Sequence, residues 1–478
     1  MKEKEVLCEV FDKCGGCKFL DVEYHKQLEN KDKMLQKLFQ GVTDKDTKIY
    51  NVIGMKNPYN YRNKGKYVLG NINRKYKMGL YEEGTHRIVN TTKCALHSEM
   101  INEVASYVFE LIKKYKLVPY NEDTKHGLIR HLIIRYGINT NEIMIIFVTA
   151  NAKISKRELI VKDIIERYPN VKTIVQNINE KESSAVLGDT NYKLYGNGYI
   201  VDKLGELKFK ISPLSFYQVN PVQTKVLYSK AIEFAELTGD EIIYDLYSGI
   251  GTISLFASKH VKEVIGIESV KDAVKDAIQN AKLNNIGNAK FLTGRVENVL
   301  PEMIKREKKA DIIFVDPPRI GLDKNAIETL LSVRAKKIIY ISCNPESLVQ
   351  DLKKLKSQYK ILKIQPVDMF PQTSHVETVV QLVRKIPDTY IDITVDIDEL
   401  DLTLSEARAT YEEIKDYIFD KYRVKISSLY IAQVKQKHGI IERECYNNSK
   451  KENLNQPQCP SEKVKLIEEA LRHFKMIP

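Results

Sequence analysis

The 478-residue sequence predicts an α/β protein whose centre is a doubly wound, parallel β-sheet. Between residues 241 and 341, five short apolar segments have the length and composition of buried strands, and helical patterns alternate with them. Acidic or glycine-rich turns follow several of these segments. Strands that alternate with helices form parallel sheets, whose ligands bind beyond the carboxyl ends of the strands. The residues that follow each strand are therefore candidates for a functional site.

The elements of the predicted sheet follow one another at regular intervals. A helix is expected at 222–237, before the first strand. The five strands are expected at 241–245, 264–268, 290–293, 311–316 and 337–341.

Other elements are predicted on both sides of this sheet. Upstream, apolar runs at 128–135 and 142–148 flank a turn and predict a β-hairpin, followed by a helix at 155–168 and a strand at 171–175. Downstream, Thr410 and Glu413 form a capping box that opens a helix, and two more helices are expected at 428–438 and from Pro460 to His473. These patterns divide the chain into an N-terminal segment (1–100), a strand-rich central domain (101–212), the doubly wound domain (213–387) and a small helical C-terminal extension (388–478).

Composition narrows the class of protein. The hydrophobic fraction is 43% and the charged fraction 29%, as in soluble globular proteins. No apolar run approaches the roughly 18 residues of a membrane span, and the N-terminal residues lack the apolar core of a signal peptide. We therefore expect a cytoplasmic monomer without a membrane partner. Lys and Arg outnumber Asp and Glu by 75 to 63, and the net charge of +12 suits a polyanion such as RNA; charge for solubility alone is the alternative.

A glycine-rich turn follows the first strand of the sheet. Asp245 ends the strand, Gly249 and Gly251 follow, and Glu268 ends the next strand. Glycine lets the backbone approach a ligand closely, and Glu268 is placed to accept the two ribose hydroxyls of a nucleoside. Residue 254 is Ser, so the third glycine of a dinucleotide fingerprint is missing. The pattern favours S-adenosylmethionine over NAD.

Two prolines follow Asp316 at the end of the fourth strand, and they fix the directions of Asp316 and Arg319. Methyltransferases that act on amino groups usually have an aromatic residue where Arg319 stands. This argues against an exocyclic amine as the target. A turn without a ligand is the alternative.

Cys343 follows the fifth strand, at the predicted ligand edge. A lone cysteine there is more often a buried apolar residue than a nucleophile. Two features favour the nucleophile. Asn344 and Pro345 turn the chain into a helix, whose N-terminus we expect to lower the pKa of the thiol, and Glu377 supplies a carboxylate farther along.

A nucleophile with a separate base is what methylation of a ring carbon requires. Carbon 5 of uracil is a poor nucleophile, but a thiolate added at carbon 6 turns the ring into an enolate that can attack a sulfonium methyl group. A base must then remove the proton from carbon 5 so that the thiol can leave.

Three cysteines, Cys8, Cys14 and Cys17, lie within ten residues near the N-terminus, and Cys94 could complete a set of four. Four thiolates suit either zinc or an iron–sulfur cluster. Zinc sites usually pair two C-x-x-C units, whereas this spacing is three plus one. The spacing therefore favours an iron–sulfur cluster, with zinc as the alternative.

Together these motifs resemble the RNA uracil-5-methyltransferase family, above all its iron–sulfur branch that acts on 23S ribosomal RNA. The matching segments are the four cysteines, Ser215 to Asn220, Asp245 to Tyr247, Glu268, Asp316 to Arg319, Ser342 to Pro345, and His375 to Glu377. They stand in the family's order and extend from residue 8 to about residue 384.

The resemblance implies a role for each matching residue. Cys343 is the nucleophile and Glu377 the base. Gln218, Tyr247, Glu268 and Asp316 contact S-adenosylmethionine, at the turn that contains Gly249. Cys8, Cys14, Cys17 and Cys94 hold a 4Fe–4S cluster that is structural or positions RNA. The resemblance also implies a Rossmann-like methyltransferase domain, an RNA-binding central domain and a role in ribosomal RNA processing. The target base is expected to leave its stack to reach the thiol. Phe216 belongs to the same motif as Gln218, and a position in the core is the alternative for it.

The chain also departs from the family. Longer ribosomal members begin with a small β-barrel that binds RNA. We expect this barrel to be absent here, because Cys8 stands near the start of the sequence. The extension beyond residue 388 could replace the barrel as an RNA-binding element. Three functions stay open: methylation of 23S ribosomal RNA, the same reaction on the T-loop uridine of transfer RNA, and a non-catalytic iron–sulfur RNA-binding protein. The last would not need both Cys343 and Glu377.

Overall fold

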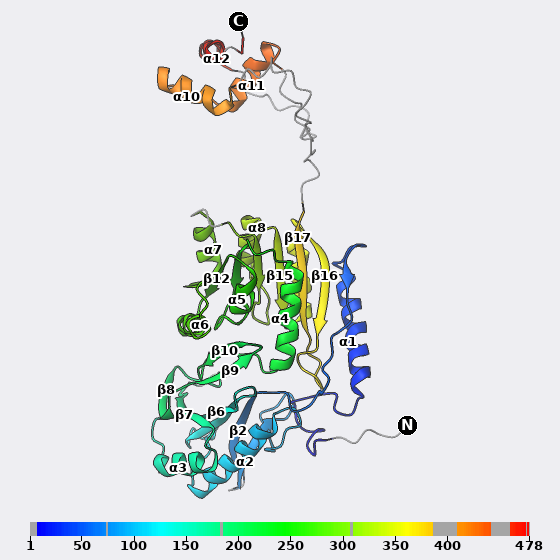
Figure 1. Ribbon diagram of the computed structural model, residues 1–478, viewed down its shortest axis with the longest axis vertical. Helices are drawn as coiled ribbons and strands as arrows, with labels where there is room; N and C mark the ends of the chain where they lie inside the picture. The colour runs from blue at the N-terminus through cyan, green and yellow to red at the C-terminus, as the bar shows by residue number, and fades with distance from the viewer. Residues whose placement is uncertain are drawn as a thin grey trace. The chain divides into compact units, whose positions relative to one another are not determined.

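The computed structural model describes residues 7–72, 75–181, 185–305, 309–385, 409–440, 459–474 and 476–477. The chain divides into two compact units, Met1–Asp388 and Thr389–Pro478. The larger unit contains two large β-sheets with helices against them, and the described residues of the smaller unit form helices (Figure 1).

An eight-stranded sheet forms the part of the larger unit where the doubly wound domain was predicted. Its strand order is β1-β16-β17-β15-β14-β11-β12-β13. All neighbours pair in parallel except at β17, which runs antiparallel to both β15 and β16. The strands are β1 (Lys48–Ile49), β11 (Ile242–Leu246), β12 (Glu263–Glu268), β13 (Ala289–Thr293), β14 (Ile312–Val315), β15 (Lys337–Ser342), β16 (Tyr359–Val367) and β17 (Glu377–Arg384). The predicted doubly wound sheet is confirmed, and β1, β16 and β17 are additions to it.

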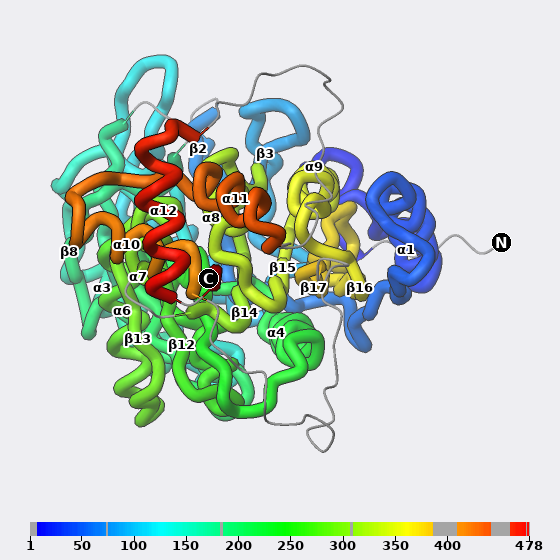
Figure 2. Tube along the Cα trace, turned by 90° about the horizontal axis from the view of Figure 1, so that it is seen from above, coloured from blue at the N-terminus to red at the C-terminus, as the bar shows by residue number. Residues whose placement is uncertain are grey.

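Helices cover both faces of this sheet. One face packs against α4 (Pro221–Ala235), α5 (Thr252–Ala257) and α6 (Lys271–Leu283). The other packs against α1 (Tyr24–Phe39), α7 (Val296–Lys305), α8 (Lys324–Val333) and α9 (Pro345–Leu355). Helix α1 comes from the N-terminal segment and lies beside α9 (Figure 2). The core strands are buried on both sides, which explains their continuous apolar composition.

A seven-stranded sheet has the order β4-β3-β2-β5-β6-β7-β8. Its strands are β2 (Lys64–Ile72), β3 (Lys75–Tyr81), β4 (Ile88–Asn90), β5 (Ile129–Gly137), β6 (Glu142–Thr149), β7 (Val171–Ile178) and β8 (Thr190–Gly196). The predicted hairpin is confirmed as β5 and β6. Helices α2 (Glu99–Lys114) and α3 (Arg157–Arg167) cover one face. The sheet continues across residue 100, and the division of the chain into four parts stays a prediction.

A two-stranded hairpin, β9 (Ile200–Leu204) and β10 (Leu207–Ile211), joins the two large sheets. The backbone N–H of Lys210 donates to Asn280 Oδ1 at 2.7 Å, and that of Lys208 donates to Asn284 Oδ1 at 2.8 Å, which binds the hairpin to α6. Its apolar side chains enter a core shared with β5, β6 and α4. The sheets therefore form one body.

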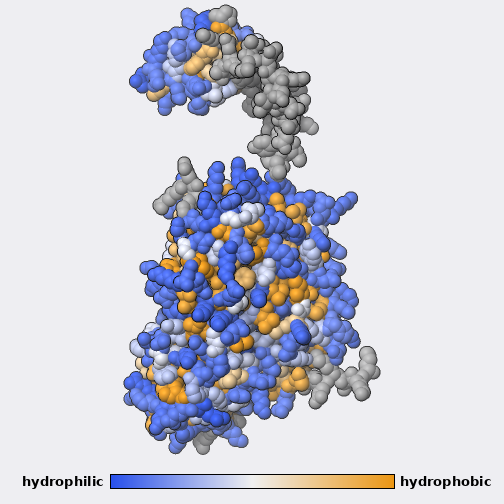
Figure 3. Space-filling model, viewed as in Figure 1, coloured by the Kyte–Doolittle hydropathy of each residue, from blue (hydrophilic) through white to orange (hydrophobic). Residues whose placement is uncertain are grey.

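The smaller unit contains α10 (Tyr411–Tyr422), α11 (Ser428–Lys437) and α12 (Ser461–His473) around a core of their own. These are the three helices predicted for the extension, and the capping box of Thr410 and Glu413 is present. Hydrophilic residues cover most of the visible surface of each unit (Figure 3). None of the helices in the described residues has the length and apolar character needed to cross a membrane.

Candidate active site

The strand order of the eight-stranded sheet reverses at β11, whose two neighbours are β12 and β14. Ligands of doubly wound sheets bind at such a switch point, beyond the carboxyl ends of the strands. Asp245, near the end of β11, and Asp316, which follows β14, both lie at this edge. Strand β17 runs the opposite way and therefore begins there. Ser342 pairs with Thr378, so the next residues outward, Cys343 and Glu377, end adjacent strands at the same edge.

Glu377 is a buried carboxyl group without a stabilising cation. Its side chain is only 2% exposed, and Oε2 has no hydrogen-bond partner among the described residues. Burial, followed by the charge of Asp316, raises the pKa of Glu377 well above its usual value. Burial and the nearby Asp245 likewise raise the pKa of Asp316 to about 7. Both causes favour the protonated form of Glu377 over its carboxylate in the free protein.

The pKa of the Cys343 thiol corrects a prediction. We expected the N-terminus of α9 to lower it, but burial, followed by Glu377 and Asp316, raises the pKa of Cys343 to about 11. Arg319 acts in the opposite direction but does not outweigh these causes. The expected lowering is wrong because the thiol is buried and because two carboxyl groups from other parts of the sequence add to the effect of burial.

The turns that carry Arg319 and Cys343 are bonded to each other. Asn344 Nδ2 and Ser347 Oγ both donate to the carbonyl oxygen of Arg319, each at 3.1 Å. Arg319 Nη2 lies 3.3 Å from Nδ1 of His375, whose pKa is lowered by burial and then by Arg319. A neutral imidazole can accept this hydrogen bond. The two motifs therefore form one unit around the thiol.

The glycine-rich turn holds Glu268 in place. The N–H of Gly249 donates to Glu268 Oε2 at 3.1 Å, and the N–H of Val270 donates to Oε1 at 2.8 Å. Gly251 has a φ of 82°, and a Cβ at this position would lie 2.8 Å from Cζ of Phe291. Glycine is therefore required at 251 for both conformation and space.

A cavity of about 540 Å³ lies beside Glu268. Its apolar wall is formed by Tyr247, Ile267, Val296, Pro318, Ile320 and Leu322. Apolar walls next to a carboxylate suit a nucleoside, with the base in the cavity and the ribose at the acid. The predicted residue Tyr247 is present here. The residues after β13 (294–297) also line the cavity and were missed, although they follow a predicted strand at the ligand edge.

Gln218 and Phe216 lie in the segment that leads into α4. Gln218 is buried, and its carbonyl oxygen accepts a hydrogen bond from Asn63 Nδ2 at 3.0 Å. Phe216 is 70% exposed, so a core position for it is wrong. Gln218 lines neither the cavity beside Glu268 nor the one beside Cys343 among the described residues.

A second cavity, of about 690 Å³, opens beside the thiol. One part of its lining comes from the strand ends and consists of Cys343, Asn344, Arg319 and His375. The other part comes from α1 and consists of Met34, Lys37 and Leu38. The contribution of α1 was not predicted.

A family model described as tRNA (uracil-5-)-methyltransferase matches residues 23–385. The chain belongs to this family. It is therefore an RNA methyltransferase of the uracil-5 class, which confirms the predicted enzyme class and fold.

Relatives and a solved structure agree with this assignment. An uncharacterized RNA methyltransferase from Bacillus cereus is 42% identical over 383 residues, which covers 80% of this chain and 83% of the relative. One from Caldanaerobacter subterraneus is 42% identical over 379 residues, 79% and 84% of the two chains. The crystal structure of the Pyrococcus abyssi tRNA (uracil-54, C5)-methyltransferase in complex with S-adenosyl-L-homocysteine has a TM-score of 0.64 and 28% identity, and covers 77% of this chain and 86% of that one.

The methyltransferase also has a basic cavity of about 860 Å³ over β2 and β5. Arg62, Lys64, Lys66 and Arg130 line it, and Glu122 is the one acidic lining residue among those described. Burial, followed by Arg135 and Lys66, lowers the pKa of Lys64 to about 7. Cations in a poorly solvated cavity favour an anionic ligand.

The four predicted cluster cysteines, Cys8, Cys14, Cys17 and Cys94, are half-buried free thiols. Burial, followed by the charges of Cys94, Cys14 and Cys8, raises the pKa of Cys17 to about 12, so the four sulfurs influence one another. Within the described part of the chain, no group of three or more His, Cys, Asp or Glu side chains has the arrangement of a metal site. The 4Fe–4S cluster stays a prediction.

Proposed function

We propose that this enzyme transfers a methyl group from S-adenosylmethionine to carbon 5 of a uridine in 23S ribosomal RNA. The observation that carries the proposal is the placement of Cys343 and Glu377 at the ends of two paired strands, next to Asp316. A thiol for carbon 6 and a carboxyl group for the carbon 5 proton are the two groups that the reaction needs.

The residues act in sequence. Cys343 Sγ, as thiolate, adds to carbon 6, and the electron pair of the carbon 5–carbon 6 double bond moves toward the oxygen on carbon 4. S-adenosylmethionine supplies the methyl group that carbon 5 takes up. Glu377 then removes the carbon 5 proton, the electrons of that bond restore the double bond, and the carbon–sulfur bond breaks. The buried carboxyl, with its raised pKa, is a stronger base than an exposed one.

The cofactor would be held at the carboxyl edge of β11, β12 and β14. Glu268 would accept the ribose hydroxyls, the cavity lined by Tyr247 would take the adenine, and Gly249 would let the backbone approach. Asp316 and Gln218 would contact the methionine part. The carboxylate of Glu268, already oriented by two backbone N–H groups, supports this assignment.

The RNA would cross the basic cavity and present its target base at Cys343. The cations at Arg62 and Lys66 suit phosphates. The exposed ring of Phe216 suits stacking on a base that has left the helix. The C-terminal unit lies beyond the family match, which ends at residue 385, and it would add RNA affinity. Deletion of residues 389–478 tests this role. If the shortened protein binds RNA and selects its target as before, the role is excluded.

A 4Fe–4S cluster on Cys8, Cys14, Cys17 and Cys94 would support the RNA-binding region. The mutual influence of these thiols and the position of Cys94 in the wall of the basic cavity support the proposal. Protein isolated without oxygen should be brown and contain iron and sulfide, and Cys17→Ser should lose the colour. A colourless protein that contains zinc would contradict it.

Transfer RNA is the second candidate substrate. The similarity to the Pyrococcus enzyme, which acts on uracil 54 of transfer RNA, favours it, whereas the cysteine set favours ribosomal RNA. Mapping 5-methyluridine in both RNAs from cells with and without the gene decides between them, because the lost methyl group identifies the substrate.

Two variants test the mechanism. Cys343→Ala should abolish turnover, and Glu377→Gln should trap a covalent protein–RNA adduct because the carbon 5 proton cannot leave. Full activity of Cys343→Ala would refute the mechanism. A non-catalytic binding protein would show neither turnover in the wild type nor an adduct in Glu377→Gln.

A further inference from the structure

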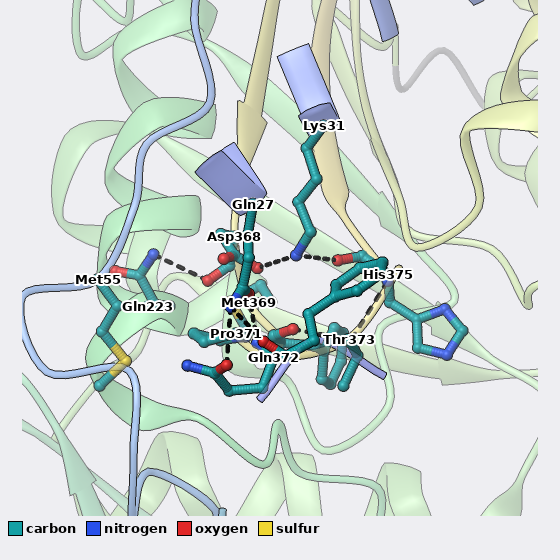
Figure 4. Close-up of polar contacts among 12 residues, drawn as sticks. Gln27, Lys31, Met55, Gln223, Asp368, Met369, Pro371, Gln372, Thr373 and His375 are labelled. Atoms are coloured by element: carbon teal, nitrogen blue, oxygen red, sulfur yellow. Dashed lines mark hydrogen bonds and ion pairs between the residues drawn. The ribbon is translucent and has the colours of Figure 1, made fainter. Parts of the chain in front are cut away.

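The segment 368–376, here named the base loop, joins β16 to β17 and leads directly into Glu377. A buried lysine of α1 binds both ends of this loop. Lys31 Nζ donates to Asp368 Oδ1 at 2.8 Å and to the carbonyl oxygen of His375 at 3.2 Å (Figure 4). The Lys31 and Asp368 side chains are 3% and 0% exposed. The second contact is two residues before the proposed base.

Other polar side chains of α1 extend this connection. Tyr24 Oη donates to Asp368 Oδ2 at 2.9 Å. Gln27 Nε2 donates to Gln372 Oε1 at 2.8 Å, and the N–H of Gln372 donates to Gln27 Oε1 at 3.2 Å (Figure 4). Gln372 has a φ of 69°, a conformation that a non-glycine residue adopts only when its surroundings hold it.

Helix α4 holds the same loop from its other side. Gln223 Nε2 donates to the carbonyl oxygen of Asp368 at 3.0 Å (Figure 4), and Asn220 Nδ2 donates to that of Met369 at 3.0 Å. The turn of Cys343 is bonded to the Arg319 turn, which meets the base loop at the contact between Arg319 and the His375 side chain, whereas Lys31 binds the loop backbone itself. The contacts of Lys31 therefore act on the side of the site that carries Glu377.

A buried ion pair is a poor means of stabilising a fold. Both charges lose their hydration, and well-packed apolar residues of similar volume often give equal or greater stability. What the pair adds is geometry, because each partner has to meet the other at a defined distance and angle. Here that geometry fixes the backbone that leads into Glu377.

We propose that Lys31 is a positioning residue for Glu377. Through Asp368 and the His375 carbonyl, it holds the carboxyl group where the carbon 5 proton of the methylated adduct can reach it. In that step Glu377 takes the proton, the electron pair of the carbon–hydrogen bond forms the ring double bond, and the carbon–sulfur bond to Cys343 breaks. The inference rests on the proposed function and concerns its last step alone.

The test separates methyl transfer from adduct resolution. The double variant Lys31→Met with Asp368→Asn removes the ion pair without leaving an unpaired buried charge. Single turnovers with tritium-labelled S-adenosylmethionine follow the label first into an SDS-stable protein–RNA adduct and then into free RNA. We expect adduct formation at the wild-type rate, but release of methylated RNA slowed by about 10-fold to 100-fold, because a displacement of roughly 1 Å costs rates of this order.

Matched controls keep the outcomes distinct. Lys33→Met removes an exposed cation of the same helix and should leave both rates unchanged. Tyr24→Phe removes the hydroxyl that donates to Asp368 and should slow the release of methylated RNA by a few-fold. If the double variant does not fold, the rates of this variant test the proposal instead. Release at the wild-type rate in a folded double variant, or equal slowing of both steps, would overturn the proposal. A wild-type enzyme that labels no RNA would refute the proposed function instead.

Discussion

The ionisation of Cys343 gives a direct test of the site's electrostatics. With a pKa of about 11, roughly 3 thiols in 10,000 are ionised at pH 7.5, compared with about 3 in 100 at the ordinary value of 9.0. A thiolate of higher pKa is intrinsically more nucleophilic, by about eightfold over this interval. Alkylation of Cys343 at pH 7.5 should therefore be about tenfold slower than that of an unperturbed thiol with equal access.

The sign of the pH dependence follows from the same pKa. Only the thiolate reacts, so the rate should rise about tenfold per pH unit up to near pH 11. Iodoacetamide labelling between pH 6.5 and 10, with mass spectrometry of the peptide that contains Cys343, measures this slope, and Cys343→Ser identifies the peptide. Arg319→Met should slow labelling further, because Arg319 lowers the pKa of the thiol. A plateau below pH 9 would show that the N-terminus of α9 outweighs burial, and would refute the reasoning.

Three further predictions concern the cofactor side. Glu268→Ala should weaken S-adenosylmethionine binding by at least about tenfold in isothermal titration, since two ribose hydrogen bonds to a charged group are lost; unchanged affinity would place the ribose elsewhere. Gly251→Ala should lower the free energy of unfolding by about 1–2 kcal/mol in denaturant titration, because of its positive φ and the contact with Phe291. The pKa of Asp245 and that of Asp316 are both raised to about 7, so binding of the cationic cofactor at pH 7 should release protons, whereas neutral S-adenosylhomocysteine should release fewer; titrations in buffers of different ionisation enthalpy measure the difference.

The central sheet could be predicted from the sequence because its strands have local signatures. Apart from Asp245, Ile242–Leu246 and Ile312–Val315 are apolar and stand between helices, which is the pattern of a buried parallel strand. Strand β1 has only two residues, and it pairs with Lys363 and Ile364 far along the chain. Strand β17 begins with the buried acid Glu377. Neither pattern indicates a strand until its partner is known.

The functional site likewise has features that the sequence predicts and features that it does not. Its motifs could be predicted because each follows a strand, and the topology brings strand ends together. The pKa of Cys343 could not, because it depends on which carboxyl groups face the thiol after β17 turns back beside β15. The role of α1 was hidden for a related reason. Its buried Gln27 and Lys31 are ordinary residues in a helix of mixed composition, and their partners lie in the base loop, more than three hundred residues away.

The raised pKa values of the site fit the order of the chemistry. Burial raises the pKa of Cys343, Glu377 and Asp316, and the charge of Asp316 raises that of the other two further. The free protein therefore favours the neutral forms and avoids several buried negative charges. The positive charge of Arg319 lowers the pKa of Cys343 and so favours its thiolate form. In the proposed mechanism Cys343 has to lose a proton before Glu377 gains one, and the positive sulfonium group of S-adenosylmethionine would favour ionisation of both groups. We therefore expect the proposed nucleophile and base to become charged in the loaded enzyme, and the thiol of the free enzyme to react poorly with oxidants.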